Sequence, residues 1–306
     1  MKHYLELVPI SARVHRKQNR MSIFCIILAV FLVTAIFGMA DMFIRSQILQ
    51  AQIDGGNFHI GIKDITDEEA TLISRRPDIQ VAARYGVLNF GGDEGYTFEG
   101  KNAVIVGCDE EYMTKLMVDI IEEGNFPQNN QQVMITLNAK EYLGLQIGDM
   151  VAINTPDGTE LHYEISGFCN DASKTMSEDS YGFFVTTSAF REIYPTEMSD
   201  ELADYNSILC VQFSDLKNIQ NTINNLKEKC HLSDEQVSEN TKLLGLLGQS
   251  SNSFMVQVYT AAIILFILVM AAGVIMITSS LNSNIIQRTE CFGLMRCLGA
   301  TLKQVM

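Results

Sequence analysis

Histidines and carboxylates are the side chains in this sequence that could do catalytic or metal chemistry. The histidines are scattered and none stands in the H-E-x-x-H spacing of a zinc protease; they are His3, His15, His59, His162 and His231. The carboxylate runs at 109–111 and 122–123 are typical of a solvated face. The sequence also lacks the Walker lysine loop and the G-x-S-x-G turn of serine hydrolases. We therefore expect no enzyme activity, no cofactor and no metal in this chain.

Cysteines offer a second kind of chemistry, either disulfides or metal binding. No pair has the C-x-x-C spacing of a zinc or redox site. Four of the seven lie in the central part of the chain, namely Cys108, Cys169, Cys210 and Cys230. Four cysteines allow three pairings. The sequence leaves open whether they pair or stay as thiols in buried strands and loops.

Two long uncharged stretches flank this central part. Residues 21–40 carry no charge, and residues 243–287 again carry none, with the densest apolar run at 254–277. A helix rises about 1.5 Å per residue, so about 20 residues cover the roughly 30 Å hydrocarbon core of a bilayer. The first run exceeds the apolar part of a signal peptide. We therefore expect two retained transmembrane helices, over residues 21–45 and 251–281.

Charge sets the expected orientation of the two helices. Eight of the 22 basic residues lie outside positions 21–281, but only two of the 36 acidic residues do, which leaves 14 basic and 34 acidic residues inside and a net charge of −20 there. Basic residues near the ends of membrane spans favour the cytoplasm. Both termini are thus expected in the cytoplasm and residues 46–250 outside it. This acidic part argues against nucleic acid as a partner, because phosphate binding needs a basic patch.

The central part mixes strand and helix patterns. Thr66 and Glu69 predict a capping box at the start of a helix that ends before Pro77, and the turn at 155–158 predicts a hairpin. Strands are expected near 58–62, 81–90, 103–106, 133–136, 151–154, 161–167, 181–187 and 208–213, and helices at 110–117, 139–143, 188–194, 216–229 and 233–249. The mixture predicts an α+β domain with a largely antiparallel sheet.

One stretch of this domain resembles a known family. It reads EGNFP at 123–127, QVMI at 132–135, LGLQIGDMV at 143–151 and YEISGF at 163–168. This is similar to the periplasmic-type domain of MacB-like permeases, in which a GRxFP, EVVI, LGLKVGD and VVGI pattern recurs. Glycines such as Gly148 suit tight turns that feed strands. The matching residues therefore form the fold and mark no chemical site.

A second stretch follows the second uncharged run. Residues 288–305 read RTECFGLMRCLGATLKQV and resemble the segment after the second span of FtsX-like permeases. In that family the segment forms a cytoplasmic coupling helix that contacts a separate ATPase subunit. The resemblance implies such a role for Arg288, Glu290, Gly293, Arg296 and Gly299. The alternative for each of them is local helix capping or topology-setting charge.

Together the two resemblances imply a multi-pass permease subunit of an ABC transporter in the cell membrane. It would couple ATP hydrolysis on a partner ATPase to export or to extracytoplasmic mechanotransmission, acting on lipoproteins, peptides or antimicrobial peptides. Its partners would be the ATPase, membrane lipids and a second permease subunit in a homo- or heterodimer. The expected layout is a basic amphipathic segment at 1–20, a span at 21–45, a MacB-like α+β domain at 46–250, a span at 251–281 and the coupling helix at 282–306.

The number of spans separates two interpretations. Permeases of this family normally have at least four spans, whereas this sequence stops at Met306 after the coupling motif. We expect it to be the front part of a longer permease; the alternative is a gene that is itself truncated. The alternative is a two-span membrane receptor with an extracellular ligand-binding domain. Against a receptor, only some 20 residues follow the second span, too few for a kinase, a cyclase or an adaptor coil. No motif names a substrate.

Overall fold

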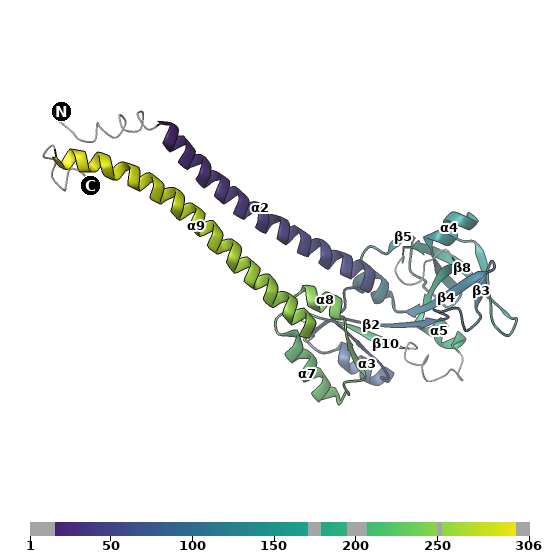
Figure 1. Cartoon of the computed structure of the whole chain (residues 1–306). Helices are drawn as coiled ribbons and strands as arrows, with labels where there is room; N and C mark the ends of the chain where they lie inside the picture. Colours follow the sequence, from purple (N-terminus) through teal and green to yellow (C-terminus); the bar gives the residue numbers. More distant parts are fainter. Residues whose placement is uncertain (1–15, 171–178, 195–206, 250–252, 298–306) are drawn as a thin grey trace. The chain divides into compact units, whose positions relative to one another are not determined.

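The computed structural model describes residues 16–170, 179–194, 207–249 and 253–297. The chain divides into two compact units. One unit combines residues 1–44 with residues 256–306, and the other is Arg45–Met255. Figure 1 shows two long helices in the first unit and a mixture of strands and short helices in the second, here called the globular unit.

The two long helices are α2, Arg16–Gly55, and α9, Ser253–Cys297. Many of their described apolar side chains are exposed, among them Phe31 at 62% and Ile275 at 68%. The rings of Phe37 and Phe266 lie 4.9 Å apart. Within the described residues, no helix combines the length and the apolar character that a membrane crossing requires. The spans expected at 21–45 and 251–281 stay a prediction.

Six strands of the globular unit close into a ring. Each pairs with the next in the order β4, β3, β7, β8, β6, β9, and β9 pairs back with β4. Their bounds are Lys101–Cys108 for β4, Thr97–Phe98 for β3, Met150–Asn154 for β7, Glu160–Cys169 for β8, Gln132–Thr136 for β6 and Ser180–Thr186 for β9. Two of these pairings, β4–β9 and β6–β8, are parallel. A seventh strand, β5 (Ile121–Gly124), pairs with β8.

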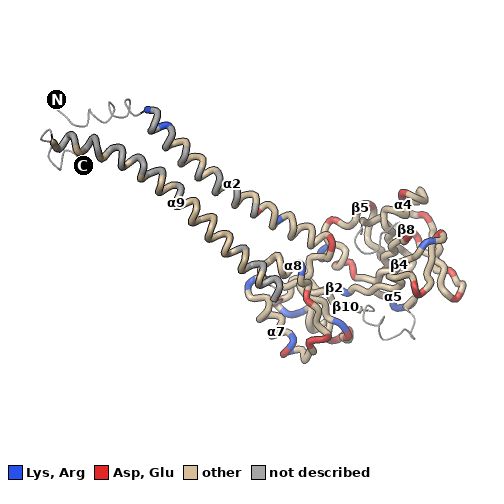
Figure 2. The backbone as a smooth tube through the Cα atoms, viewed as in Figure 1, with Lys and Arg blue, Asp and Glu red and all other residues tan. Residues whose placement is uncertain are grey.

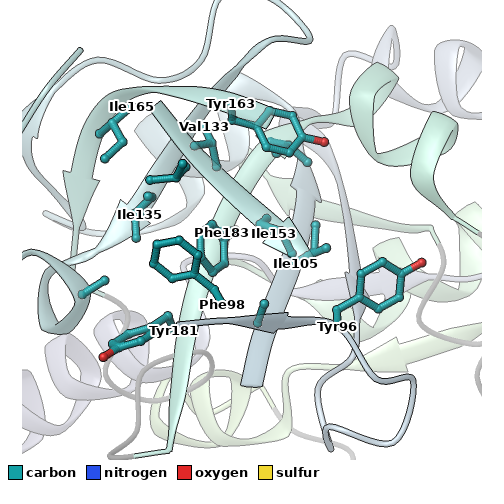
Figure 3. Packing of buried hydrophobic residues seen from close by; sticks show 14 of the residues in the cluster. Tyr96, Phe98, Ile105, Val133, Ile135, Ile153, Tyr163, Ile165, Tyr181 and Phe183 are labelled. Carbon is teal, nitrogen blue, oxygen red and sulfur yellow. The ribbon is translucent and has the colours of Figure 1, made fainter. Parts of the chain in front are cut away.

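The ring encloses a hydrophobic core. Alternate residues of a strand point to opposite faces, so each strand contributes every second side chain to the interior. Ile105, Val133 and Phe183 are fully buried there (Figure 3). The ring of Phe98 meets that of Phe183 edge to face, with centroids 5.2 Å apart. This core fixes the position of the helix that follows β9.

Four further strands extend the sheet from β4 with antiparallel pairings. They follow the order β2, β10, β1, β11 and span Ile79–Leu88, Ile208–Phe213, Ile60–Ile62 and Val237–Glu239. On one face, Leu209 and Val211 pack in a cluster with α3 (Asp67–Ser74) and α7 (Ile219–Cys230). On the other face, Cys210 packs with the π-helical turn η2 (Tyr112–Leu116). Strand β4 thus belongs to the ring and to this extension.

The short helices and turns test the local predictions. The capping box of Thr66 and Glu69 and the hairpin turn at 155–158 are confirmed, as is the α+β domain with a largely antiparallel sheet. The expected helix at 110–117 is the π-helical turn instead. Helices at the other expected places are α4 (Leu137–Leu143), α5 (Thr187–Ile193) and α7.

The helix expected at 233–249 is wrong. Ser233 and Gln236 exchange the hydrogen bonds of a capping box, but these bonds close a turn. Strand β11 follows, because the edge of β1 is there to pair with it. Only then does the short helix α8 (Thr241–Leu246) begin, capped by Asn240.

The two units differ in their content of charged residues. Figure 2 shows Asp and Glu spread over the globular unit, whereas the described parts of α2 and α9 carry few charges.

The described cysteines of the central part form no disulfide in the structure. They are Cys108, Cys169, Cys210 and Cys230.

Candidate functional site

The five predicted coupling positions lie at the end of the chain. Four of them, at 288, 290, 293 and 296, belong to the last turns of α9, and Gly299 lies outside the described residues. A Cβ built on Gly293 would meet no atom within 4 Å. A partner could therefore approach the helix backbone closely at that point. The coupling role of these residues stays a prediction.

A polar groove in the globular unit is the site that the sequence did not predict. It has a volume of about 340 Å³ and lies between α3, α5 and the adjoining strands β2 and β10. Its polar lining comprises Asp67, Thr71, Ser74, Arg84, Asp109, Thr187 and Arg191. Helix α3 packs on the sheet extension, whereas α5 packs on the ring through Phe190. The groove therefore lies where the two parts of the sheet meet.

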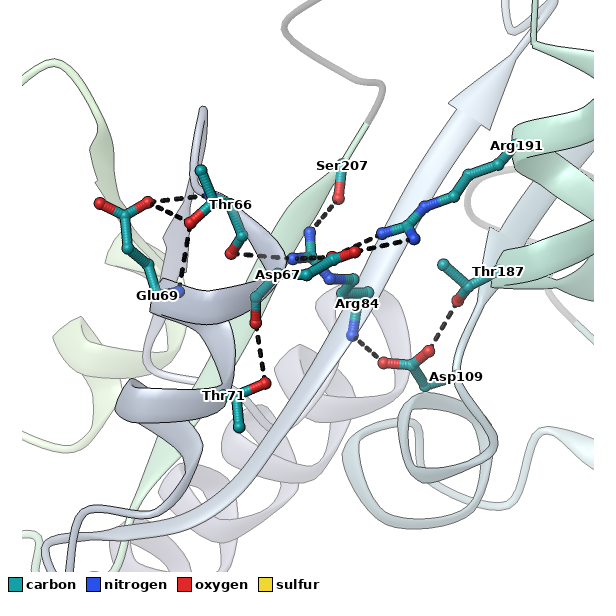
Figure 4. A network of polar contacts seen from close by, with 9 residues as sticks. All are labelled: Thr66, Asp67, Glu69, Thr71, Arg84, Asp109, Thr187, Arg191 and Ser207. Atoms are coloured by element: carbon teal, nitrogen blue, oxygen red, sulfur yellow. Dashed lines mark hydrogen bonds and ion pairs between the residues drawn. The ribbon is translucent and has the colours of Figure 1, made fainter.

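Two arginines converge on one carboxylate in this groove (Figure 4). Arg191 of α5 donates from Nη1 to Asp67 Oδ2 over 3.0 Å and from Nη2 to Oδ1 over 2.7 Å. Arg84 of β2 brings its Nη2 to 2.7 Å from the same Oδ1. A guanidinium binds a carboxylate best in this two-point arrangement. Asp67, at the start of α3, consequently links α3 to α5 across strand β2.

Arg84 is held in place from several sides. Its Nη1 donates to Ser207 Oγ over 2.5 Å and its Nη2 to the Thr66 carbonyl oxygen over 3.2 Å. Its side chain is only 10% exposed. Asp109 accepts hydrogen bonds from the backbone N–H of Arg84 and from the hydroxyl of Thr187. These contacts fix the guanidinium of Arg84 at the floor of the groove.

Electrostatics favour the charged forms of Asp67 and Arg191. The pKa of Asp67 is lowered, first because Arg191 donates hydrogen bonds to it and then because the charges of Arg191 and Arg84 attract the carboxylate. The same pair raises the pKa of Arg191. Two arginines thus face Asp67 and Asp109. With Asp67 withdrawn, the groove would carry one excess positive charge.

A second group of polar contacts ties the end of α2 to the start of α8. Asp54 Oδ2 lies 2.8 Å from Lys242 Nζ. Asn240 donates from Nδ2 to the carbonyl oxygens of Gly56 and Phe58, over 3.3 and 3.1 Å. The connection from α2 into β1 is therefore bonded to the segment that leaves β11. We call this set of contacts the junction.

Metal binding finds no support in the described part of the chain. No three His, Cys, Asp or Glu residues there are grouped so that they could hold an ion. The histidine nearest to the junction, His59, is buried and accepts a hydrogen bond from the Phe213 N–H at Nδ1. Burial lowers the pKa of His59 to about 4, so the side chain is neutral. It serves the fold.

Comparison with known proteins identifies the family. The model of the MacB-like periplasmic core domain matches residues 21–229, more than half of the chain. The chain belongs to this family. MacB-like domains are extracytoplasmic parts of ABC-type transporter permeases, and membership implies an ATPase as partner. No curated protein sequence matches the chain.

Solved structures of MacB-like domains resemble the chain over most of their own length. The periplasmic region of MacB from Actinobacillus actinomycetemcomitans is 15% identical, with 65% of this chain and 96% of that chain covered and a TM-score of 0.43. The extracellular domain of the noncanonic ABC-type transporter YknZ from Gram-positive bacteria is 13% identical, with 60% and 98% covered and a TM-score of 0.40.

Sequence reasoning missed the groove because its residues are far apart in the chain. Asp67 and Arg191 are separated by 124 positions. Neither residue belongs to a spaced motif. Asp67 was visible only as the first residue after the Thr66 cap, and Arg191 only as a basic residue on a short helix. The ring closure that brings α5 toward α3 has no signature in any single segment.

Proposed function

We propose that this MacB-like chain is the permease subunit of an ABC transporter that couples ATP hydrolysis on a partner ATPase to export or to extracytoplasmic mechanotransmission. The observation that carries the proposal is the family match over residues 21–229. The motif at 288–305 supports it, because it follows the second uncharged stretch in the order that FtsX-like permeases have. This proposal requires no catalytic reaction by the chain itself.

The proposal includes a membrane location with both termini in the cytoplasm and residues 46–250 outside. Supporting it are the two uncharged stretches, the basic ends and the exposed apolar side chains of α2 and α9, such as Phe31 and Ile275. Large exposed apolar surfaces need another apolar phase or a partner to cover them. Lipid tails and a second permease subunit would cover them here.

The helix α2 offers a mechanical route within this proposal. It is one continuous helix of 40 residues, which corresponds to roughly 60 Å. Its last turns belong to the globular unit, where Ala51 is fully buried. The junction then bonds its end to the start of α8 through Asp54–Lys242 and Asn240. A displacement of α2 would move β1 and α8 together, because motion passes between elements that are packed and bonded to one another.

Co-purification tests the coupling. The full chain, tagged and extracted in detergent, would be captured from membranes of cells that also express the candidate ATPase. The double variant Gly293→Leu with Arg296→Glu adds bulk and reverses charge at two motif positions. We expect it to retain at least tenfold less ATPase than the native chain.

The matched control changes two exposed positions of the same helix end, Thr289→Ala with Cys297→Ala. It should retain the ATPase as the native chain does. Equal retention by the coupling variant and the control would remove these positions from the coupling role. Absence of any ATPase from the native sample, with the chain correctly inserted, would favour the receptor interpretation.

A further inference from the structure

The groove between α3 and α5 has the features of a ligand site for which the proposed function gives no role. Its volume of about 340 Å³ is at the small end of the range of about 300–1,000 Å³ typical of ligand pockets. Three apolar residues, Ala70, Ala82 and Leu209, line it beside the polar and charged groups. Such a site would accept a small molecule or the end of a chain.

The arrangement of the two arginines specifies the chemistry. Arg191 holds the two oxygens of Asp67 with two nitrogens, while Arg84 approaches one of the same oxygens. A guanidinium fork can bind a carboxylate or a phosphate through two hydrogen bonds. The group that occupies the fork here is the carboxylate of Asp67. The observed occupant therefore points to a carboxylate as the ligand group.

Asp67 is the most exposed member of this ion-pair set. Its side chain is 64% exposed, compared with 51% for Arg191 and 10% for Arg84. Exposed ion pairs add little stability, so solvent and other anions compete with them. Arg84 keeps Ser207 and the Thr66 carbonyl as partners when Asp67 moves, and Asp109 keeps the Arg84 N–H and Thr187. Arg84 and Asp109 therefore keep these contacts, and the guanidinium of Arg191 becomes available to another carboxylate.

We propose that this groove binds a small ligand through a carboxylate, and that Asp67 occupies the place of that carboxylate in the free protein. The two arginines hold the ligand carboxylate, and only a short carbon body fits beside it, because the apolar lining residues Ala70 and Leu209 are themselves buried. Asp67 competes from within the chain, where a tethered group acts at an effective concentration of about millimolar or more. This site does not depend on ATPase coupling.

Two kinds of ligand carry such a carboxylate: a free short-chain acid, and a peptide through its C-terminal residue. Butyrate represents the first and N-acetylalanine the second. N-acetylalaninamide has the same body without the negative charge, and inorganic phosphate supplies an anion of different shape. Isothermal titration of each probe into the full chain in detergent measures its affinity at fixed salt, because surface charges are screened by ions.

The decisive variants are Asp67→Asn and Arg191→Gln. We expect Asp67→Asn to bind a carboxylate probe at least tenfold more tightly than the native chain, because the internal competitor is gone. Adding Arg191→Gln to Asp67→Asn should reverse this gain by at least tenfold. Glu68→Gln removes the same charge one residue away, and Arg75→Gln removes an exposed arginine; each should leave affinity within about twofold, since ordinary surface substitutions have small effects.

The outcomes separate clearly. Tighter binding of butyrate and N-acetylalanine alike assigns the site to small acids, and binding of N-acetylalanine alone assigns it to peptide ends. An affinity of Asp67→Asn no better than that of Glu68→Gln would overturn the proposal. So would equal binding of N-acetylalaninamide, or tighter binding of phosphate than of both acids. Near-ultraviolet circular dichroism checks that each variant is folded, using tyrosines because the chain has no tryptophan.

Discussion

The globular unit and the two long helices use apolar residues in opposite ways. In the globular unit, Phe183 and Phe184 are no more than 1% exposed, and three clusters of buried side chains fill the ring and both faces of its extension. In α2 and α9, Phe31 and Phe266 are 62% and 50% exposed. One unit folds by excluding water from its own interior. The other presents its apolar side chains outward.

Substitutions should affect folding in the globular unit and leave it nearly unchanged in the exposed parts of α2 and α9. A side chain buried in a close-packed core contributes to folding by its volume and shape. An exposed side chain on a helix contributes little to folding and acts through whatever surrounds the helix. The same substitution should therefore cost much more folding stability in the globular unit than in the two long helices.

The largest contrast is expected between two glycines. A Cβ on Gly107 would overlap the Cβ and Cγ atoms of Phe190, whereas a Cβ on Gly38 in α2 would meet nothing within 4 Å. Gly107→Ala should lower the free energy of unfolding by about 4 kcal/mol or more, in the range reserved for severe core defects. Gly38→Ala should leave the unfolding of the globular unit unchanged.

Unfolding in denaturant, followed by the near-ultraviolet dichroism of tyrosine, measures both glycine variants. A stable Gly107→Ala protein would mean that Phe190 and α5 move aside easily. That result would also weaken the description of the groove, because α5 carries Arg191.

A second contrast compares two phenylalanines. Phe183→Ala removes a fully buried ring from the core of the strand ring and should cost about 3–5 kcal/mol of unfolding free energy. Phe266→Ala in α9 removes a half-exposed ring that faces Phe37 and should cost the globular unit nothing measurable. Equal losses from the two variants would indicate that the units unfold as one.

The third prediction concerns acid and the buried His59. Its pKa is lowered to about 4 in the folded protein, below the ordinary value of 6.5, because burial disfavours the charged form. Between these values the unfolded chain binds a proton that the folded chain does not, so stability falls as the pH drops from about 6.5 to about 4. The loss approaches about 3 kcal/mol.

His59→Asn removes this titration while an amide oxygen can still accept the hydrogen bond from Phe213 N–H. The difference in unfolding free energy between the native chain and His59→Asn should therefore shrink or reverse toward pH 4.5. Carboxylates titrate in both proteins and cancel in the difference. A difference that stays constant between pH 7 and pH 4.5 would show that His59 is not buried as a neutral group.

The smallest effect is expected at the groove. Asp67→Asn should lower the unfolding free energy by only about 1 kcal/mol, since its ion pairs with Arg191 and Arg84 involve an exposed carboxylate. The loss should shrink further at 1 M salt, because salt screens exposed charges. A salt-independent loss of several kcal/mol would mean that Asp67 is a structural link and is not displaceable.

The sequence predicted local structure well and long-range assembly poorly. The cap of Thr66 with Glu69 and the hairpin at 155–158 depend on residues a few positions apart, so the pattern is present in the chain itself. The closure of the ring depends on the parallel pairing of β4 with β9, which are more than 70 residues apart in the chain. No local spacing encodes that pairing.

The wrong helix at 233–249 illustrates the same limit. Ser233 and Gln236 satisfy the local signature, and their side chains make the expected bonds. The backbone of Val237–Glu239 nevertheless joins β1, because an open strand edge supplies hydrogen bonds that a helix would otherwise supply internally. The groove was missed for a related reason, since Asp67, Arg84 and Arg191 meet only after the sheet is complete.

Labelling of single cysteines in intact cells with a membrane-impermeant maleimide can test whether the chain forms a hairpin of two spans with the globular unit outside. Glu235→Cys lies at an exposed turn of the globular unit, and Thr289→Cys lies at an exposed position near the end of α9. We predict that Glu235→Cys is labelled in intact cells and Thr289→Cys only after the membrane is permeabilised, each above the background of the unsubstituted chain. Labelling of Thr289→Cys in intact cells, or protection of Glu235→Cys there, would contradict the account.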